Sequence, residues 1–145
     1  MELKYKKAII EDIPTLISIE QSIVGSKTYS AMLEESEWIK AINDGPVYII
    51  EKDSKIAGDV MYEMKSPDHA YISGILILPE FQRQGIARQA MDYILKEIGE
   101  VKRIDLVTHP DNFKAISLYE SLGFKIESRK EDYFGDGEPR VVMAR

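Results

Sequence analysis

Cysteine is absent from the sequence, and histidine occurs only at His69 and His109. The absence of cysteine excludes disulfide bonds, thiolate nucleophiles and cysteine-ligated zinc. Two histidines cannot by themselves form a histidine-rich metal site, so we expect no bound metal. No apolar run approaches the ~20 residues that span a bilayer, and no long apolar stretch follows the basic N-terminus. We therefore expect no membrane partner, no signal peptide and a cytoplasmic protein.

Positive charge is also scarce, because 19 Lys and Arg residues against 25 Asp and Glu residues give a formal net charge of −6. A general nucleic-acid binder needs a basic surface, so we expect no nucleic-acid partner. Cations nevertheless come together at Arg83 and Arg88, which flank a short uncharged stretch. Such a local cluster on an acidic protein suggests a small anionic ligand, although charge alone favours two solvated arginines at the start of a helix.

Apolar residues (44%) and charged residues (30%) are balanced as in a globular protein, and the length suits one domain, covering residues 1–145. Periodicity and turn signals predict strands at 3–10, 47–50, 56–64, 70–78, 104–108, 124–133 and 140–144. Helices are predicted from Asp12 and Pro14 onward, and over about 30–43, 85–98 and 112–122. This order predicts a mixed α/β domain.

The strand predicted at 70–78 carries apolar residues on both faces, which indicates burial at the centre of the sheet. Strict alternation assigns Tyr71, Ile75 and Ile77 to one face and Ile72, Leu76 and Leu78 to the other. The strand–helix–strand unit from 70 to 108 favours a parallel strand pair with a right-handed crossover.

The junction between that strand and the next helix carries the strongest local motif, Gln82-Arg83-Gln84-Gly85-Ile86-Ala87-Arg88. The first N–H groups of a helix lack intrahelical partners and carry the positive end of the helix dipole. Gly85 lets the backbone approach a ligand closely, and the two arginines add charge. These features predict a pyrophosphate site, with a tight turn that binds nothing as the alternative. Neither the Walker A motif nor a Gly-x-Gly-x-x-Gly fingerprint is present.

A second group lies on the helix predicted at 112–122, where Asn112 and Tyr119 share one face. An amide and a phenol two turns apart can both contact one extended ligand, since they lie roughly 10 Å apart along the axis. Alternatively, Asn112 is an N-cap and Tyr119 a core aromatic. The spacing alone favours these structural roles.

Both motifs resemble those of the GNAT N-acetyltransferases. The stretch 78–87 is similar to motif A, Gln/Arg-x-x-Gly-x-Gly/Ala, and the stretch 112–124 is similar to motif B, in the same order and at the same separation. The resemblance implies the GNAT fold, a mixed and mostly antiparallel sheet with a central parallel strand pair and about four helices. It also implies an acetyl-CoA-dependent N-acetyltransferase, with acetyl-CoA as co-substrate and no metal.

The resemblance also implies roles for individual residues. The pantetheine arm of acetyl-CoA is expected to contact Ile75, Leu76 and Ile77. Its pyrophosphate is expected to contact Arg83, Gln84, Gly85, Ile86, Ala87 and Arg88. Asn112 is a further expected contact of acetyl-CoA. Tyr119 is implied as the acid that protonates the departing CoA thiolate, which suits a phenol with a pKa of about 10. A backbone N–H near Ile77 is expected to stabilise the oxyanion.

Within this superfamily the chain resembles the RimI-type protein N-terminal acetyltransferases, which implies a protein or peptide N-terminus as acceptor. The segment 133–138 is similar to their tyrosine-rich Asp-Gly-Glu hairpin, so Tyr133 and Glu138 are candidate acceptor contacts, although Asp136-Gly137 also makes an ordinary hairpin turn. Tyr71 matches a tyrosine that some N-terminal acetyltransferases use, with a core aromatic as the alternative.

The chain departs from that pattern around the expected base. RimI-type enzymes carry a glutamate or histidine where this chain has Val107, which cannot accept a proton. His109, two residues further on, is the candidate replacement, with a loop residue as the alternative, and Pro139-Arg140 replaces their Asp-Ala. A small-molecule amine acceptor, such as a polyamine or amino acid, and a non-catalytic acyl-CoA-binding module therefore stay open, as does the choice between a monomer and a homodimer.

Overall fold

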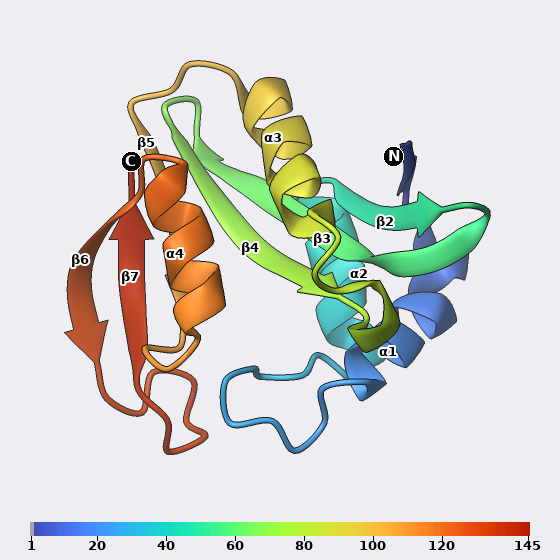
Figure 1. Ribbon diagram of the computed structural model, residues 1–145, viewed down its shortest axis with the longest axis horizontal. Helices are drawn as coiled ribbons and strands as arrows, with labels where there is room; N and C mark the ends of the chain where they lie inside the picture. Colours follow the sequence, from blue (N-terminus) through green and yellow to red (C-terminus); the bar gives the residue numbers. More distant parts are fainter. Residues whose placement is uncertain (1) are drawn as a thin grey trace.

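The computed structural model describes residues 2–145, which form one mixed sheet with helices on both faces (Figure 1). The strands are β1 (Leu3–Lys7), β2 (Val47–Lys52), β3 (Lys55–Ser66), β4 (His69–Ile77), β5 (Arg103–Thr108), β6 (Lys125–Lys130) and β7 (Arg140–Ala144). The helices are α1 (Ile13–Gln21), α2 (Glu35–Asp44), α3 (Ile86–Ile98) and α4 (Phe113–Ser121), with 3-10 turns at Ile10–Asp12 and Pro79–Phe81. No helix within residues 2–145 has the length and apolarity needed to cross a membrane.

The order of strands in the sheet is β1-β2-β3-β4-β5-β7-β6. Among the described residues, β4 and β5 form the one parallel pair, and every other neighbouring pair is antiparallel. The predicted fold, a mostly antiparallel sheet with a central parallel pair and four helices, is therefore confirmed.

Two hydrophobic clusters hold the helices against opposite faces of the sheet. On one face, α3 and α4 pack through residues such as Ile86, Met91 and Tyr119. On the other face, α1 and α2 pack around Trp38, whose side chain is fully buried and whose Nε1 donates to the carbonyl oxygen of Met32 at 2.9 Å. The centre of the sheet is thus covered from both sides, as its apolar strands predict.

β4 departs from strict alternation at Ser73. The pairing register between β3 and β4 shifts there, so that Ser73 has no partner in β3 and its side chain is exposed. A bulge of this kind turns the side chains that follow it to the opposite face. Ile72 and Ile75, on either side of the bulge, consequently contact the same cluster. The prediction that these two residues lie on opposite faces was therefore wrong.

β4 and β5 separate halfway along β4. They pair from His69 to Ile72 on β4 and from Arg103 to Leu106 on β5. Beyond these residues β4 continues beside β3 and β5 continues beside β7, so the two halves of the sheet diverge (Figure 1). Within residues 2–145, no strand lies along the β5-facing edge of β4 after Ile72. An unpaired strand edge offers N–H and C=O groups to an extended ligand.

The two helices beside this divergence begin and end at the residues that the sequence predicts. Gly85 is the N-cap of α3 and has a φ of 79°, in the left-handed region that favours glycine. Asn112 is the N-cap of α4, and its Oδ1 accepts a hydrogen bond from the N–H of Ala115 at 3.4 Å. Gly123, with a φ of 95°, follows the last turn of α4.

Three predicted elements were too long. β1 ends at Lys7, because Ile9 and Ile10 are exposed rather than part of the sheet. α2 begins at Glu35 and β6 ends at Lys130. Residues 22–34 therefore form a long α1–α2 loop, and residues 131–139 form a long β6–β7 loop.

Candidate active site

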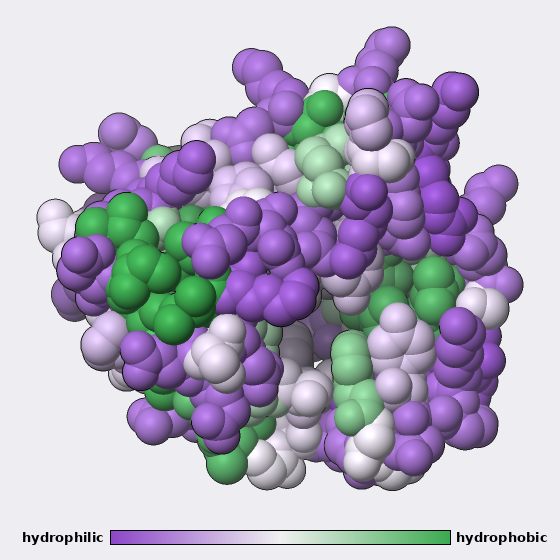
Figure 2. Space-filling view, turned by 180° about the vertical axis from the view of Figure 1, so that it is seen from behind, coloured by the Kyte–Doolittle hydropathy of each residue, from purple (hydrophilic) through white to green (hydrophobic). Residues whose placement is uncertain are grey.

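Two cavities open from the divergence between β4 and β5. The helix cavity has a volume of about 390 Å³ and is bordered by β4, the start of α3 and α4. The loop cavity has a volume of about 340 Å³ and is bordered mainly by β3, β4, β5 and the two long loops, with single residues from α1, α2, α4 and β7. Of the described residues, those that border both cavities are Tyr29, Ile75, Asn112 and Tyr119. Figure 2 shows a hollow near the centre of the face opposite to the view of Figure 1.

The helix cavity ends at the turn that begins α3. Arg83, Gly85, Ile86 and Ala87 border the cavity there. Gly85 faces open space, because a methyl group on its Cα would have no other atom within 4 Å. Arg83 also has a positive φ, 64°, and its side chain is exposed. The first N–H groups of α3 lie at this turn without intrahelical partners, an arrangement that binds anions.

The side chains of Gln84 and Arg88 turn away from the helix cavity. Gln84 accepts a hydrogen bond from Lys52 Nζ, and Arg88 donates one to the hydroxyl of Ser121. Neither residue borders the cavity. The cavity wall at this turn is therefore formed by Arg83, Gly85, Ile86 and Ala87 rather than by these two side chains.

The open edge of β4 connects the two cavities. Ile77 borders the helix cavity, Leu76 borders the loop cavity and Ile75 borders both. The side-chain amide of Gln82 donates to the carbonyl oxygen of Ile77 at 3.0 Å, which ties the turn before α3 to the end of β4. A ligand that extends from this turn along the edge reaches Tyr119.

Tyr119 on α4 lies where the two cavities meet, and its side chain is 7% exposed. Burial, and to a lesser extent the neighbouring Tyr29 phenol, raise the pKa of Tyr119 above its usual range. The phenol therefore keeps its proton at neutral pH and is available as a proton donor. Tyr29 comes from the α1–α2 loop, and no sequence pattern indicated that it reaches the site.

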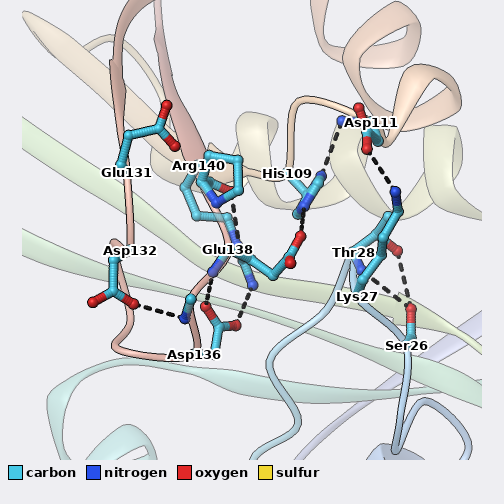
Figure 3. Close-up of polar contacts among 12 residues, drawn as sticks. Ser26, Lys27, Thr28, His109, Asp111, Glu131, Asp132, Asp136, Glu138 and Arg140 are labelled. Carbon is cyan, nitrogen blue, oxygen red and sulfur yellow. Dashed lines mark hydrogen bonds and ion pairs between the residues drawn. The ribbon is translucent and has the colours of Figure 1, made fainter.

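His109 is fully buried beside the start of α4 and borders neither cavity. Its Nδ1 accepts a hydrogen bond from the N–H of Asp111 at 3.0 Å, so the proton of the neutral ring is on Nε2, which lies 2.7 Å from Oε1 of Glu138 (Figure 3). Lys27 of the α1–α2 loop pairs with Asp111 at 2.9 Å, so three loops meet here. Both ring nitrogens are engaged, and His109 can accept a proton at Nδ1 only after the hydrogen bond from the N–H of Asp111 opens.

The residues predicted to contact the acceptor divide between the loop cavity and its surroundings. Tyr71 borders the loop cavity, whereas Tyr133 and Glu138 do not. Val107, at the position where the resemblance places a base, also borders it. Burial, followed by the effect of Tyr133, raises the pKa of Tyr71 to about 12. Phe134 is the residue of the β6–β7 loop that borders the loop cavity. The centre of its ring lies 4.7 Å from that of Tyr133.

Buried charges in the wall of the loop cavity were missed by the sequence analysis. Glu20 on α1 is 7% exposed, Asp59 on β3 is 1% exposed and Arg140 on β7 is 2% exposed. Arg140 is paired, because its Nη2 donates to Asp136 Oδ2 at 2.9 Å (Figure 3). The one sequence signal was the charge of Asp59 within an apolar strand segment. Within residues 2–145 no three His, Asp or Glu residues are grouped closely enough to hold a metal ion.

Burial raises the pKa of the Asp59 carboxyl well above its ordinary value, and the carboxyl of Glu20 adds to this rise. Burial also raises the pKa of Glu20. Above the ordinary pKa of an aspartate, the unfolded chain releases the proton that folded Asp59 retains. The contribution of Asp59 to stability is therefore lost as the pH rises from that value toward its folded pKa.

The variant Asp59→Asn is expected to raise the free energy of unfolding by about 1–3 kcal/mol near pH 8 and to change it little near pH 4. The amide of asparagine carries no charge, so it avoids the cost of ionising a buried carboxyl beside Glu20. Urea unfolding at both pH values measures the difference. Asp92→Asn, which removes an exposed carboxyl from α3, is the control. A change of equal size at both pH values would contradict the raised pKa.

Comparison with known proteins gives a family match over most of the chain. Residues 13–124 match the Acetyltransferase (GNAT) family. The ribosomal protein bS18-alanine N-acetyltransferase of Escherichia coli K12 is 29% identical over 141 residues, which are 92% of this chain and 90% of that protein. The N-alpha-acetyltransferase of Saccharolobus solfataricus is 33% identical over 78 residues, which are 52% of this chain and 47% of that protein.

Solved structures share the fold over the whole chain. The ribosomal-protein-S18-alanine N-acetyltransferase from Escherichia coli superposes with a TM-score of 0.82 at 23% identity, covering 99% of this chain and 92% of that one. Arabidopsis thaliana Naa50, solved in complex with the bisubstrate analogue CoA-Ac-MVNAL, superposes with a TM-score of 0.82 at 14% identity, covering 100% of this chain and 99% of that one. At these identities the likeness shows the fold.

Proposed function

The chain belongs to the GNAT family of acetyltransferases and is an N-acetyltransferase, and we propose that its acceptor is the α-amine of a protein or peptide N-terminus. One observation carries the proposal: two cavities meet at Tyr119 and the open edge of β4. A thioester held in the helix cavity and an amine held in the loop cavity can react by direct attack at this junction. Acetyl-CoA supplies the acetyl group as that thioester.

The residues of the helix cavity fit acetyl-CoA. The space beside Gly85 and the first N–H groups of α3 suit a diphosphate, and Arg83 at the rim adds positive charge. The open edge of β4 along Ile75 and Ile77 suits the amides of a pantetheine arm, which can pair with a strand edge as another strand would. Asn112 borders both cavities beside the reacting end of such an arm.

Tyr119 is the proposed acid for the departing thiolate, since its phenol is protonated and borders both cavities. A backbone N–H of β4 near Ile77 is the proposed donor to the developing charge on the carbonyl oxygen. The attacking amine must first lose a proton, and Val107 cannot accept it. His109 is the proposed base, in a state in which the hydrogen bond from the N–H of Asp111 to its Nδ1 has opened.

The loop cavity supports a peptide end as acceptor. The α1–α2 loop and the β6–β7 loop flank it, and the side chains of Tyr71 and Phe134 contribute aromatic surface to its wall. The name of the relative from Escherichia coli gives an alanine of ribosomal protein bS18 as its acceptor. The relative from Saccharolobus solfataricus is named an N-alpha-acetyltransferase. Naa50 was solved with a bisubstrate analogue, CoA-Ac-MVNAL, that joins CoA to a peptide sequence.

A panel of acceptors tests this proposal through the release of CoA. Peptides that begin with alanine, serine, methionine or lysine are compared with spermidine and with free amino acids, and the same peptides with a blocked N-terminus are the control. The best peptide is expected to exceed spermidine in kcat/KM by at least about tenfold, a difference of about 1.4 kcal/mol in transition-state binding. Turnover of spermidine with inert peptides would overturn the assignment of a peptide acceptor.

A small polyamine is the second candidate acceptor, and the acidic wall of the loop cavity favours it. Glu20, Glu37 and Asp59 all border that cavity. The third candidate, a non-catalytic acyl-CoA-binding module, has no use for a protonated phenol at the junction of two cavities. Tight binding of acetyl-CoA without turnover of any acceptor in the panel would support that module instead.

A further inference from the structure

Two buried carboxyl groups, Asp59 and Glu20, border the loop cavity. Asp59 lies on β3, is 1% exposed and has no hydrogen-bond partner for its Oδ2. Glu20 lies on α1, is 7% exposed and accepts one hydrogen bond, from the N–H of Met32 at 2.9 Å. A buried carboxyl oxygen without a partner is costly, so its presence in a cavity wall points to a ligand that supplies the missing partner.

Nothing in the described chain neutralises this pair. Within residues 2–145 no lysine, arginine or histidine contacts the carboxyl of Glu20 or Asp59. Arg140 borders the same cavity, but Asp136 already occupies its guanidinium. Glu37, which also borders the cavity, adds further negative charge. A cation with hydrogen-bond donors would supply the missing partner and would favour the ionised form of both carboxyls.

The position of Asp59 separates it from the reacting amine. Asp59 pairs with Leu76 of β4, and the open edge of β4 faces away from β3. A ligand on that edge lies two strand spacings, roughly 10 Å, from the Asp59 backbone. Direct proton transfer needs the donor and acceptor atoms within about 3 Å of each other, so Asp59 is too far from the reacting amine to be its base. The carboxyl can instead contact a second group of the acceptor, several bonds away from the amine under attack.

We propose that Asp59 and Glu20 form an anionic subsite that binds a second ammonium group of the acceptor, three to five carbon atoms from the amine that is acetylated. This inference rests on the proposed acetyl transfer to a primary amine and names the acceptor class more closely. The second ammonium group belongs either to a lysine side chain at the first position of a peptide or to a small diamine. The two sources share one chemistry, and the experiment separates them.

The test compares acceptors of equal length that differ in one charge. One pair is a peptide with lysine first against the same peptide with norleucine first, and the other is 1,4-diaminobutane against 1-aminobutane, all with EDTA present. In the unmodified protein, kcat/KM is expected to favour the charged member of at least one pair by about tenfold or more, as a hydrogen-bonded buried charge pair does. The pair that shows this preference identifies the source.

Asp59→Asn and Glu20→Gln are the test variants, and circular dichroism shows that each is folded. Either variant is expected to bring the charged-to-uncharged ratio of kcat/KM close to one. Asp92→Asn removes an exposed carboxyl from α3 and is expected to keep the ratio of the unmodified protein. A ratio near one without any substitution, or an unchanged ratio in both variants, overturns the subsite. Equal losses on charged and uncharged acceptors in both variants also overturn it.

Calorimetric titration with 1,4-diaminobutane, in the absence of acetyl-CoA, makes the inference independent of turnover. Binding that weakens at least about tenfold in Asp59→Asn supports the subsite even if no amine is acetylated, in which case only the proposed function fails. The opposite outcome is that amines are acetylated without a charge preference and that diamine binding does not depend on Asp59. In that case the proposed function stands and the subsite is wrong.

Discussion

Replacing Tyr119 with phenylalanine is expected to lower kcat by about 10²–10⁴-fold and to leave the affinity for acetyl-CoA nearly unchanged. The substitution removes one hydroxyl from a side chain that borders both cavities and keeps the aromatic ring in its place. Because burial raises the pKa of this phenol, the hydroxyl keeps its proton at neutral pH and is the proposed proton donor. Its removal leaves the departing thiolate to take a proton from water.

Steady-state kinetics with saturating acceptor, together with calorimetric binding of acetyl-CoA, separate these two effects. Tyr93→Phe is the matched control, because Tyr93 lies on α3, stacks on Tyr5 and borders neither cavity. Its kcat is expected to stay within about twofold of the unmodified protein, as is usual for a surface substitution. A Tyr119→Phe variant with an unchanged kcat would remove Tyr119 from the mechanism. A variant that loses kcat and acetyl-CoA affinity equally would make its role one of binding.

Replacing Gly85 with valine is expected to weaken acetyl-CoA binding by about 10- to 100-fold. Gly85 has a φ of 79°, a conformation that costs a β-branched residue roughly 1–3 kcal/mol. The added side chain also enters the open space beside the first N–H groups of α3, where the diphosphate is proposed to lie. The variant can relieve the strain only by moving the turn, which displaces those N–H groups.

Gly99→Val is the control for backbone strain. Gly99 follows the other end of α3, has a φ of 74° and likewise faces open space. Both variants are expected to lose stability in urea unfolding, Gly99→Val at least as much because its φ of 74° and ψ of −154° form a conformation that essentially only glycine adopts. Only Gly85→Val is expected to raise the KM for acetyl-CoA. Equal KM values in the two variants would show that the turn before α3 does not hold the diphosphate.

The predicted order of elements was correct because periodicity is strong wherever a helix or strand buries one face. The apolar stripe of α3 and the alternation in β7 are examples, and Gly85, Asn112 and Gly123 stand at helix ends where their backbone preferences apply. These local signals also locate the turn before α3 and Tyr119. The sequence therefore predicts the position of a candidate site best where that site is formed by backbone at the end of a helix.

Apolar periodicity gives wrong predictions where one residue changes the geometry of its neighbours. The bulge at Ser73 reverses the faces of β4, and nothing in the alternation of apolar residues reveals it. The apolar residue Met32 appeared helical, but it lies in the α1–α2 loop, where its backbone contacts Trp38 and Glu20.

The acceptor side of the site was harder to predict than the acetyl-CoA side for a related reason. Its walls come from loops and from separate strands, so its members have no fixed spacing in the sequence. Tyr29 and Asp59 reach the loop cavity from the α1–α2 loop and from β3, and only the folded chain brings them together. His109 and Glu138 were predicted as separate site residues, and their contact at 2.7 Å depends on the β6–β7 loop.

A crystal structure of the protein with bound CoA tests the central claim most directly. We expect the diphosphate on the N–H groups of the turn from Arg83 to Arg88 and the pantetheine arm along the open edge of β4. The sulfur is expected within hydrogen-bonding distance of the Tyr119 hydroxyl. CoA bound elsewhere, or a helix cavity closed by side chains with the two sheet halves drawn together, would contradict the central claim.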